Sequence, residues 1–273
     1  MKTIIAATDF SPASHNAVLY AADLAMSLHA SLLLYHTVEN TVALSEASML
    51  YTGEYFPDES LCMLEELKDE LLLYTHQQED IKFKLRFGNI NNELDQLCYE
   101  EKPFLMVMAA TKKTTFERLV SGSNTLTESH YCTVPLLLIP ENVSFKKINK
   151  IAVATQFCNV CDTMPLQQLT YYLRQFNVEI EIINVAKPNG GMQGINAAEA
   201  IALQTHFKEF NPTFHYIANN QVEDGIYEYV KQLSPNLLIL IPKKHSWFHK
   251  SLSKQLILHP TVPVMIMPQH CKN

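Results

Sequence analysis

Asp9 is a candidate ligand-binding residue of this sequence. It follows a short apolar run at residues 4–7 that is typical of a strand buried on both faces. A carboxylate at the end of such a strand could accept hydrogen bonds from a ribose or a base, or help to hold a metal ion. The alternative is structural, since aspartate also begins helices through Asx turns.

A second candidate is the run Gly122-Ser123-Asn124-Thr125. A glycine followed by hydroxyl and amide side chains at the start of a helix can expose backbone N–H groups to an anion. An ordinary helix cap would explain the same four residues. The sequence has neither a GxGxxG nor a GxxxxGK[ST] motif, which excludes a Rossmann fingerprint and a Walker loop.

Two further patterns involve cysteine and histidine. Cys158 and Cys161 have the spacing of a thioredoxin site, which leaves redox activity as a minor alternative, but no second pair completes a zinc site. His245 and His249 are four residues apart in a basic, loop-like run that contains no carboxylate. That run could attract an anionic ligand or an acidic partner. No constellation of residues indicates a catalytic site, so we expect a protein that is not an enzyme.

The elements that must position these residues occur twice in the same order. Apolar runs and periodicity predict strands in the first half near 4–7, 31–36, 81–87, 104–108 and 134–139, and helices near 12–28, 58–78, 90–100 and 122–130. In the second half they predict strands near 149–154, 178–184, 213–217, 237–241 and 263–267, and helices near 162–175, 195–209, 222–232 and 251–258. Alternating strands and helices favour parallel sheets with right-handed crossovers.

We therefore expect an α/β protein of two tandem doubly wound domains related by a pseudo-twofold axis. The predicted domains are residues 1–142 and 147–273, each with a sheet of its own. Ligands of such sheets bind beyond the carboxyl ends of the strands. The closing strands, 134–139 and 262–267, are apolar edge strands, and we expect them to lie at the interface between the domains.

The composition of the chain limits which classes of binding partner are expected. The chain has 273 residues, of which 47% are hydrophobic and 18% are charged, and a formal net charge of −7. No long basic run is present, so nucleic acid is not expected as a partner. No apolar stretch approaches the roughly 20 residues that cross a membrane. Met1 and Lys2 lead straight into a strand without a signal-peptide layout, which predicts a cytoplasmic protein. A protein partner or a homodimer remains open.

The chain resembles a tandem universal stress protein over nearly its whole length. The resemblance rests on Thr8-Asp9-Phe10-Ser11, on Gly88 after the third strand, on Gly122-Ser123-Asn124-Thr125, and on a closing Val-Pro-apolar strand in both halves. It implies five-stranded parallel domains of the adenine nucleotide alpha hydrolase type. It also implies association through the closing strand.

One branch of that family binds ATP through three spaced glycines followed by serine or threonine. The resemblance places the last glycine and the hydroxyl on Gly122 and Ser123, and the two earlier glycines on Ala109 and Lys112. It implies that Asp9 lies on the adenosine side and that Thr37 or Val38 lines the adenine pocket. Gly122, Ser123 and Asn124 are expected at the phosphates, and Thr125 is a further candidate for nucleotide binding. Ala109 adds a methyl group, and Lys112 could offer charge to a phosphate.

The second half departs further from that pattern. Gln156 stands in place of Asp9, Pro242 is near the first glycine position, and Lys250-Ser251 replaces Gly-Ser. We expect a stress-response protein that binds ATP or a related nucleotide, with magnesium, weakly in its first half only. The alternative is a nucleotide-free scaffold that acts through protein contacts.

Overall fold

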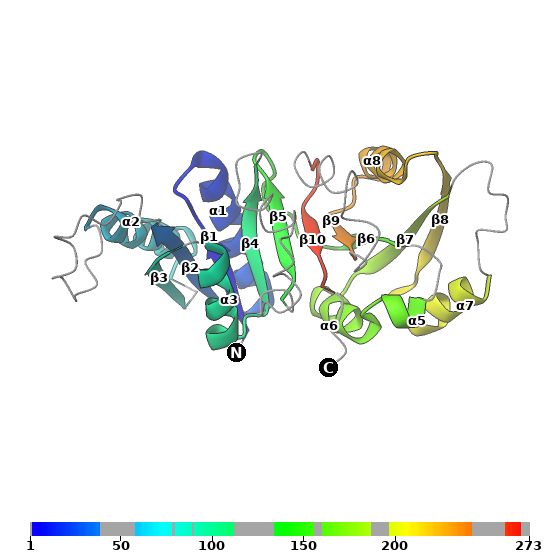
Figure 1. Cartoon of the computed structure of the whole chain (residues 1–273), viewed down its shortest axis with the longest axis horizontal. Coiled ribbons are helices and arrows are strands. Elements are labelled where there is room, and N and C mark those ends of the chain that lie inside the picture. Colours follow the sequence, from blue (N-terminus) through cyan, green and yellow to red (C-terminus); the bar gives the residue numbers. More distant parts are fainter. Residues whose placement is uncertain are drawn as a thin grey trace, which may run out of the picture.

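A computed structural model of the chain describes residues 2–38, 58–77, 80–88, 90–111, 134–155, 160–186, 197–241 and 260–268. The molecule is elongated, and the two halves of the sequence lie side by side along its long axis (Figure 1). Each half is built on five parallel strands, as the alternating pattern predicts.

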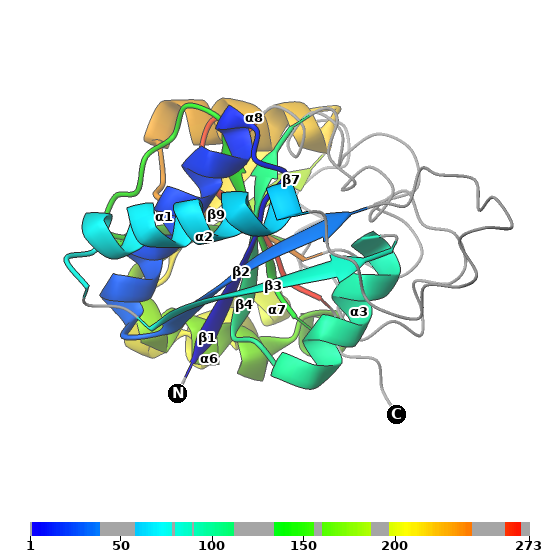
Figure 2. The same ribbon diagram turned by 90° about the vertical axis from the view of Figure 1, so that its left-hand side faces the viewer.

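The first half forms a sheet in the order β3-β2-β1-β4-β5, with every pair parallel. Its strands are β1 (Thr3–Ala7), β2 (Ser31–Val38), β3 (Ile81–Phe87), β4 (Leu105–Ala110) and β5 (Leu136–Pro140). Its helices are α1 (Pro12–Leu28), α2 (Asp58–Tyr74) and α3 (Ile90–Glu101). Helices α1 and α2 cover one face of the sheet and α3 covers the other (Figure 2).

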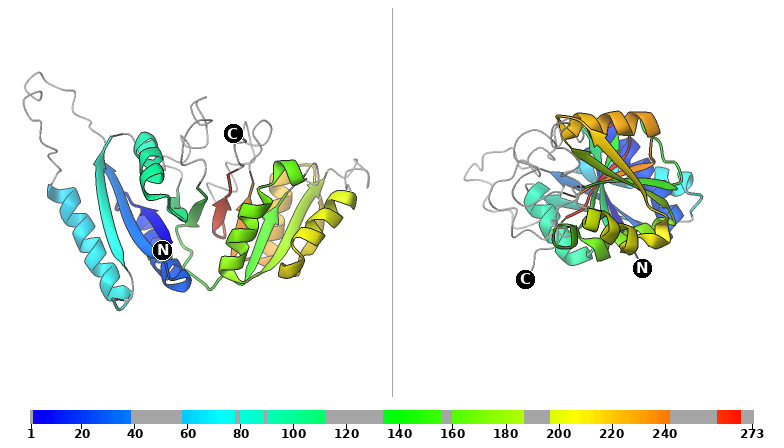
Figure 3. Two further views of the ribbon diagram at one scale, coloured as in Figure 1. Left: turned by 90° about the horizontal axis from the view of Figure 1, so that it is seen from below. Right: turned by 90° about the vertical axis from the view of Figure 1, so that its right-hand side faces the viewer.

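The second half repeats this order as β10-β9-β6-β7-β8. Its strands are β6 (Lys150–Ala154), β7 (Glu179–Ala186), β8 (Thr213–Ala218), β9 (Leu237–Leu240) and β10 (Val264–Ile266). Its helices are α5 (Val160–Thr163), α6 (Leu166–Phe176), α7 (Ala197–His206), a 3-10 turn η6 (Lys208–Phe210) and α8 (Val222–Leu233). Helices α6 and α7 pack on one face and α8 on the other (Figure 3).

Two predicted helices of the second half are shorter than expected. The helix predicted over 162–175 is divided into α5 and α6 because Pro165 cannot continue a helix that precedes it. The helix predicted over 195–209 ends at His206, and its last residues form the 3-10 turn η6. The predicted helices 122–130 and 251–258 lie outside the described residues.

The two halves share one sheet, so the expectation of separate sheets is wrong. Strands β5 and β10 pair antiparallel, with Leu137 opposite Met265, and join ten strands into a continuous sheet. The prediction that the closing strands meet between the halves is confirmed. Each strand would otherwise leave an apolar edge with unpaired backbone groups, and their pairing satisfies both edges at once.

Aromatic side chains also connect the two halves beside the paired strands β5 and β10, which we call the seam. The Tyr172 hydroxyl on α6 donates a hydrogen bond to the carbonyl of Phe104, just before β4. The rings of Phe104 and Tyr172 have centroids 4.6 Å apart. The Lys2 ammonium lies 5.4 Å from the centroid of the Phe104 ring and donates to Gln175 of α6. These contacts tie the start of β4 in one half to α6 in the other.

Candidate nucleotide site

The carboxyl ends of β1, β2 and β4 form one edge of the first half. Strands β1 and β4 are neighbours, and the chain continues from β1 to β2 on one side of this pair and from β4 to β5 on the other. This is the switch point at which doubly wound sheets bind ligands. Four of the site residues predicted from the sequence lie at this edge. Asp9 follows β1, Thr37 and Val38 end β2, and Ala109 is the second-to-last residue of β4.

Asp9 is exposed, and one of its carboxylate oxygens is engaged by the start of α1. Asp9 Oδ1 accepts hydrogen bonds from the Ser11 backbone N–H at 3.1 Å and from the Ser11 hydroxyl at 2.6 Å. Ser11 in turn caps α1 by accepting from the Ser14 N–H. Partial burial raises the pKa of the Asp9 carboxyl, but hydrogen bonds from Ser11 and Ser14 outweigh it and hold that pKa below its ordinary value. The carboxylate is therefore ionised at neutral pH.

The loop after β1 is held by residues that sequence reasoning missed. The His36 Nδ1–H of β2 donates to the Thr8 carbonyl at 2.8 Å. The His36 ring lies against Phe10, with centroids 4.6 Å apart. Phe10 has a positive φ of 61°, and its N–H donates to the Thr8 hydroxyl at 3.0 Å. The only signal in the sequence was the position of His36 next to Thr37, where a polar residue interrupts an apolar strand.

The adenine-side residues differ in how much surface they offer. Thr37 and Val38 are half-buried, and the Val38 carbonyl accepts from the Gly88 N–H at 3.1 Å. Ala109 is only 3% exposed and packs in the core on the α1 side of the sheet. The predicted phosphate-side residues Lys112, Gly122, Ser123, Asn124 and Thr125 lie outside the described residues.

The matching edge of the second half has neutral side chains where it is described. Thr155 follows β6 as Thr8 follows β1, and Asn184 takes the place of His36, with its Nδ2 donating to the Thr155 carbonyl at 3.2 Å. The loop anchor is thus repeated in both halves with a different side chain. Gln156, Cys158, Pro242 and Lys250-Ser251 lie outside the described residues, and of the predicted redox pair only the backbone of Cys161, in α5, is described.

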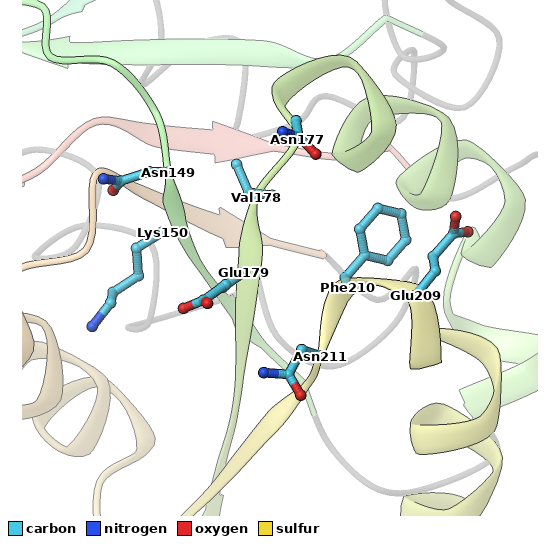
Figure 4. Close-up of a pocket in the computed structure, with 8 residues that line it drawn as sticks. All are labelled: Asn149, Lys150, Asn177, Val178, Glu179, Glu209, Phe210 and Asn211. Carbon is cyan, nitrogen blue, oxygen red and sulfur yellow. The ribbon is translucent and has the colours of Figure 1, made fainter.

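A hollow of about 480 Å³ lies at the opposite, amino-terminal edge of β6 and β7. Figure 4 shows Asn149, Lys150 and Glu179 on one side of it and Glu209 and Phe210 on the other. Two of the charged groups are already paired, Lys150 with Glu181 at 3.2 Å and Glu209 with Arg174 at 2.8 Å. Its position and these pairs make it a weaker candidate than the carboxyl edge of the first half.

Neither a metal centre nor a membrane span emerges from the described ranges. Within them, no cluster of three or more His, Cys, Asp or Glu side chains is arranged to hold a metal ion. Of the helices that the structure describes, none is both long and apolar enough to cross a membrane.

Comparison with known proteins shows which solved structures have a similar fold. No curated protein sequence matches the chain. A universal stress protein from Archaeoglobus fulgidus DSM 4304 is structurally similar, with a TM-score of 0.68, 13% identity and 98% coverage of both chains. The cytoplasmic domain of a prokaryotic cation chloride cotransporter also matches, with a TM-score of 0.53, 10% identity, and coverage of 97% of this chain and 94% of that one. At such identities these similarities show the α/β fold alone.

The amino-acid sequence identifies the family of this chain. The model of the universal stress protein family matches residues 1–140. This match spans just over half of the 273 residues and includes Asp9 and the whole carboxyl edge of the first sheet. The chain therefore belongs to the universal stress protein family.

Proposed function

We propose that this universal stress protein takes part in a stress response and binds ATP or a related adenine nucleotide, with magnesium, in its first half. The observation that supports this most is an ionised, exposed carboxylate, Asp9, at the switch point of a doubly wound sheet. There it would accept hydrogen bonds from the ribose hydroxyls, while Thr37 and Val38 would contact the base.

The proposed affinity is weak because two spaced glycines of the family pattern are absent. Ala109 is buried in the core, so its backbone cannot approach a ligand as closely as that of a glycine. Lys112 stands at the second glycine position, and its charge could compensate for part of the loss at the phosphates. No group proposed here would carry out a chemical step on the nucleotide, so the proposed role is binding rather than catalysis.

Calorimetry with ATP and magnesium tests this proposal. Asp9→Ala should weaken binding by about tenfold or more, as expected for the loss of a charged acceptor. The same variant should lose about 0.5–1.5 kcal/mol of stability because Ser11 loses its acceptor. Asp9→Asn keeps an acceptor for Ser11 and should fold like the wild type, yet still bind less tightly. Asp69→Asn on the exposed side of α2 makes the same charge change away from the site and should bind like the wild type.

A nucleotide-free scaffold is the second candidate, and a specific contact favours it. The two hydrogen bonds from Ser11 to Asp9 Oδ1 account for this aspartate as a helix-entry residue without any ligand. If wild-type protein shows no saturable heat with ATP and magnesium, the scaffold reading replaces the nucleotide proposal. Asp9→Ala would then change only the melting temperature.

A further inference from the structure

A hollow of about 410 Å³ lies between the two halves, beneath the segment that links them. Its walls come from α1, from the link, from the turn before β9 and from the turn before β10. The described residues that line it are Tyr20, Asn142, Val143, Ser144, Lys146, Ser234, Pro235, Asn236, Thr261, Val262 and Pro263. None of these residues belongs to the nucleotide site proposed at Asp9, Thr37 and Val38.

The runs that precede β4 and β9 correspond to each other but differ in their third residue. Lys102-Pro103-Phe104 precedes β4 and Ser234-Pro235-Asn236 precedes β9, and the first residue of each run has the same left-handed backbone, with φ of 45° and 43°. On the β4 side, the Phe104 ring fills the contact with Tyr171 and Tyr172 of α6. On the β9 side the equivalent residue is the smaller, polar Asn236, which lines the hollow. There Tyr20 of α1 packs edge-on against Phe145 of the link, with ring centroids 5.2 Å apart.

Most of the side chains around this space are amides and hydroxyls, which both donate and accept hydrogen bonds. Amides and hydroxyls line it together with the Lys146 ammonium, and no carboxylate occurs among the described lining residues. Asn236 Oδ1 already accepts from the backbone N–H groups of Asn149 at 3.1 Å and Lys150 at 3.0 Å. Its amide oxygen is thus used within the protein, and the amide NH₂ is what Asn236 can offer to a ligand.

The positive charge of Lys146 favours an anionic ligand in this hollow. Lys146 is exposed and has no ion-pair partner among the described residues, in a chain of net charge −7. The carboxyl end of α8 reaches the same corner at Ser234, and its partial negative charge opposes an anion. An anion would therefore depend on Lys146 for its binding.

We propose that this hollow binds a small organic oxyanion, a phosphate monoester or a carboxylate, between Lys146 of the link and Asn236 before β9. The volume is that of a site for a small metabolite. A ligand there would touch both halves and the link at once.

The test titrates the full chain with glycerol 3-phosphate, citrate and inorganic phosphate, followed by NMR shifts of the link. Lys146→Gln should weaken binding at least about tenfold. Lys147→Gln removes the same charge from the neighbouring residue, which does not line the hollow, and should bind within about twofold of the wild type. Preference for glycerol 3-phosphate or for citrate then distinguishes a phosphate ligand from a carboxylate.

Asn236→Asp provides a variant that preserves the fold. The new carboxylate still accepts from the N–H groups of Asn149 and Lys150, so the melting temperature should stay close to that of the wild type. Its negative charge should abolish anion binding. The proposal is overturned if the wild type binds none of the three probes saturably, if Lys146→Gln and Lys147→Gln weaken binding equally, or if Asn236→Asp binds as well as the wild type.

Discussion

Leu137→Asp should destabilise the protein by more than about 4 kcal/mol, the largest effect expected of a single substitution here. Leu137 is fully buried in β5, opposite Met265 of β10 at the seam between the halves. An aspartate there would place an unpaired carboxylate in the interior and also remove the packing of the leucine. Urea unfolding should show a much lower midpoint, and the exposed seam should promote aggregation.

The same leucine-to-aspartate change at an exposed position shows how much of the destabilisation depends on burial. Leu73 lies on α2 and is 74% exposed. Leu73→Asp makes the same change at the surface and should alter stability by no more than about 0.5 kcal/mol. A Leu137→Asp variant that melts with the wild type would contradict the seam as a stabilising interface.

Gly88→Ala should cost about 1–3 kcal/mol although it adds one methyl group. Gly88 directly follows β3 and has a φ of +134°, a conformation that residues with a side chain rarely adopt. A Cβ atom at this position would also lie 2.9 Å from Glu93 Oε1. The loss should appear as a lower melting temperature in differential scanning calorimetry.

The background variant Glu93→Ala tells the two causes apart. It removes the carboxylate that a Cβ at Gly88 would meet, while the backbone at residue 88 keeps its positive φ. Gly88→Ala should therefore remain destabilising in the Glu93→Ala background, by a smaller amount. A Gly88→Ala protein as stable as the wild type would show that this turn adjusts without strain.

Much of the fold could be predicted because its buried strands are continuous apolar runs. Residues 4–7 and 237–240 are buried on both faces, which fixes them as central strands of parallel sheets. The beginning of α1 could also be predicted, because Ser11 is a typical N-cap residue and Pro12 occupies the first position of the helix.

The joining of the sheets and the details of the sites could not be predicted in the same way. The closing strands show an apolar edge, but whether that edge pairs with the other half or is covered otherwise depends on tertiary packing. From the sequence, Asp9 fits either a ligand-binding residue or a helix-entry residue. In the structure, hydrogen bonds from Ser11 occupy one of its carboxylate oxygens. Phe10 and His36 anchor the loop after β1 through a positive φ and a ring contact that no local pattern announces.

The seam also has a consequence for how the two halves can evolve. Because β5 and β10 belong to one chain, their pairing is intramolecular, and dilution cannot separate them as it would two subunits. In a homodimer each substitution appears on both sides of the axis. Here a change such as Phe104 against Asn236 is confined to one side, so one junction can remain a packed aromatic contact while the other acquires a different use.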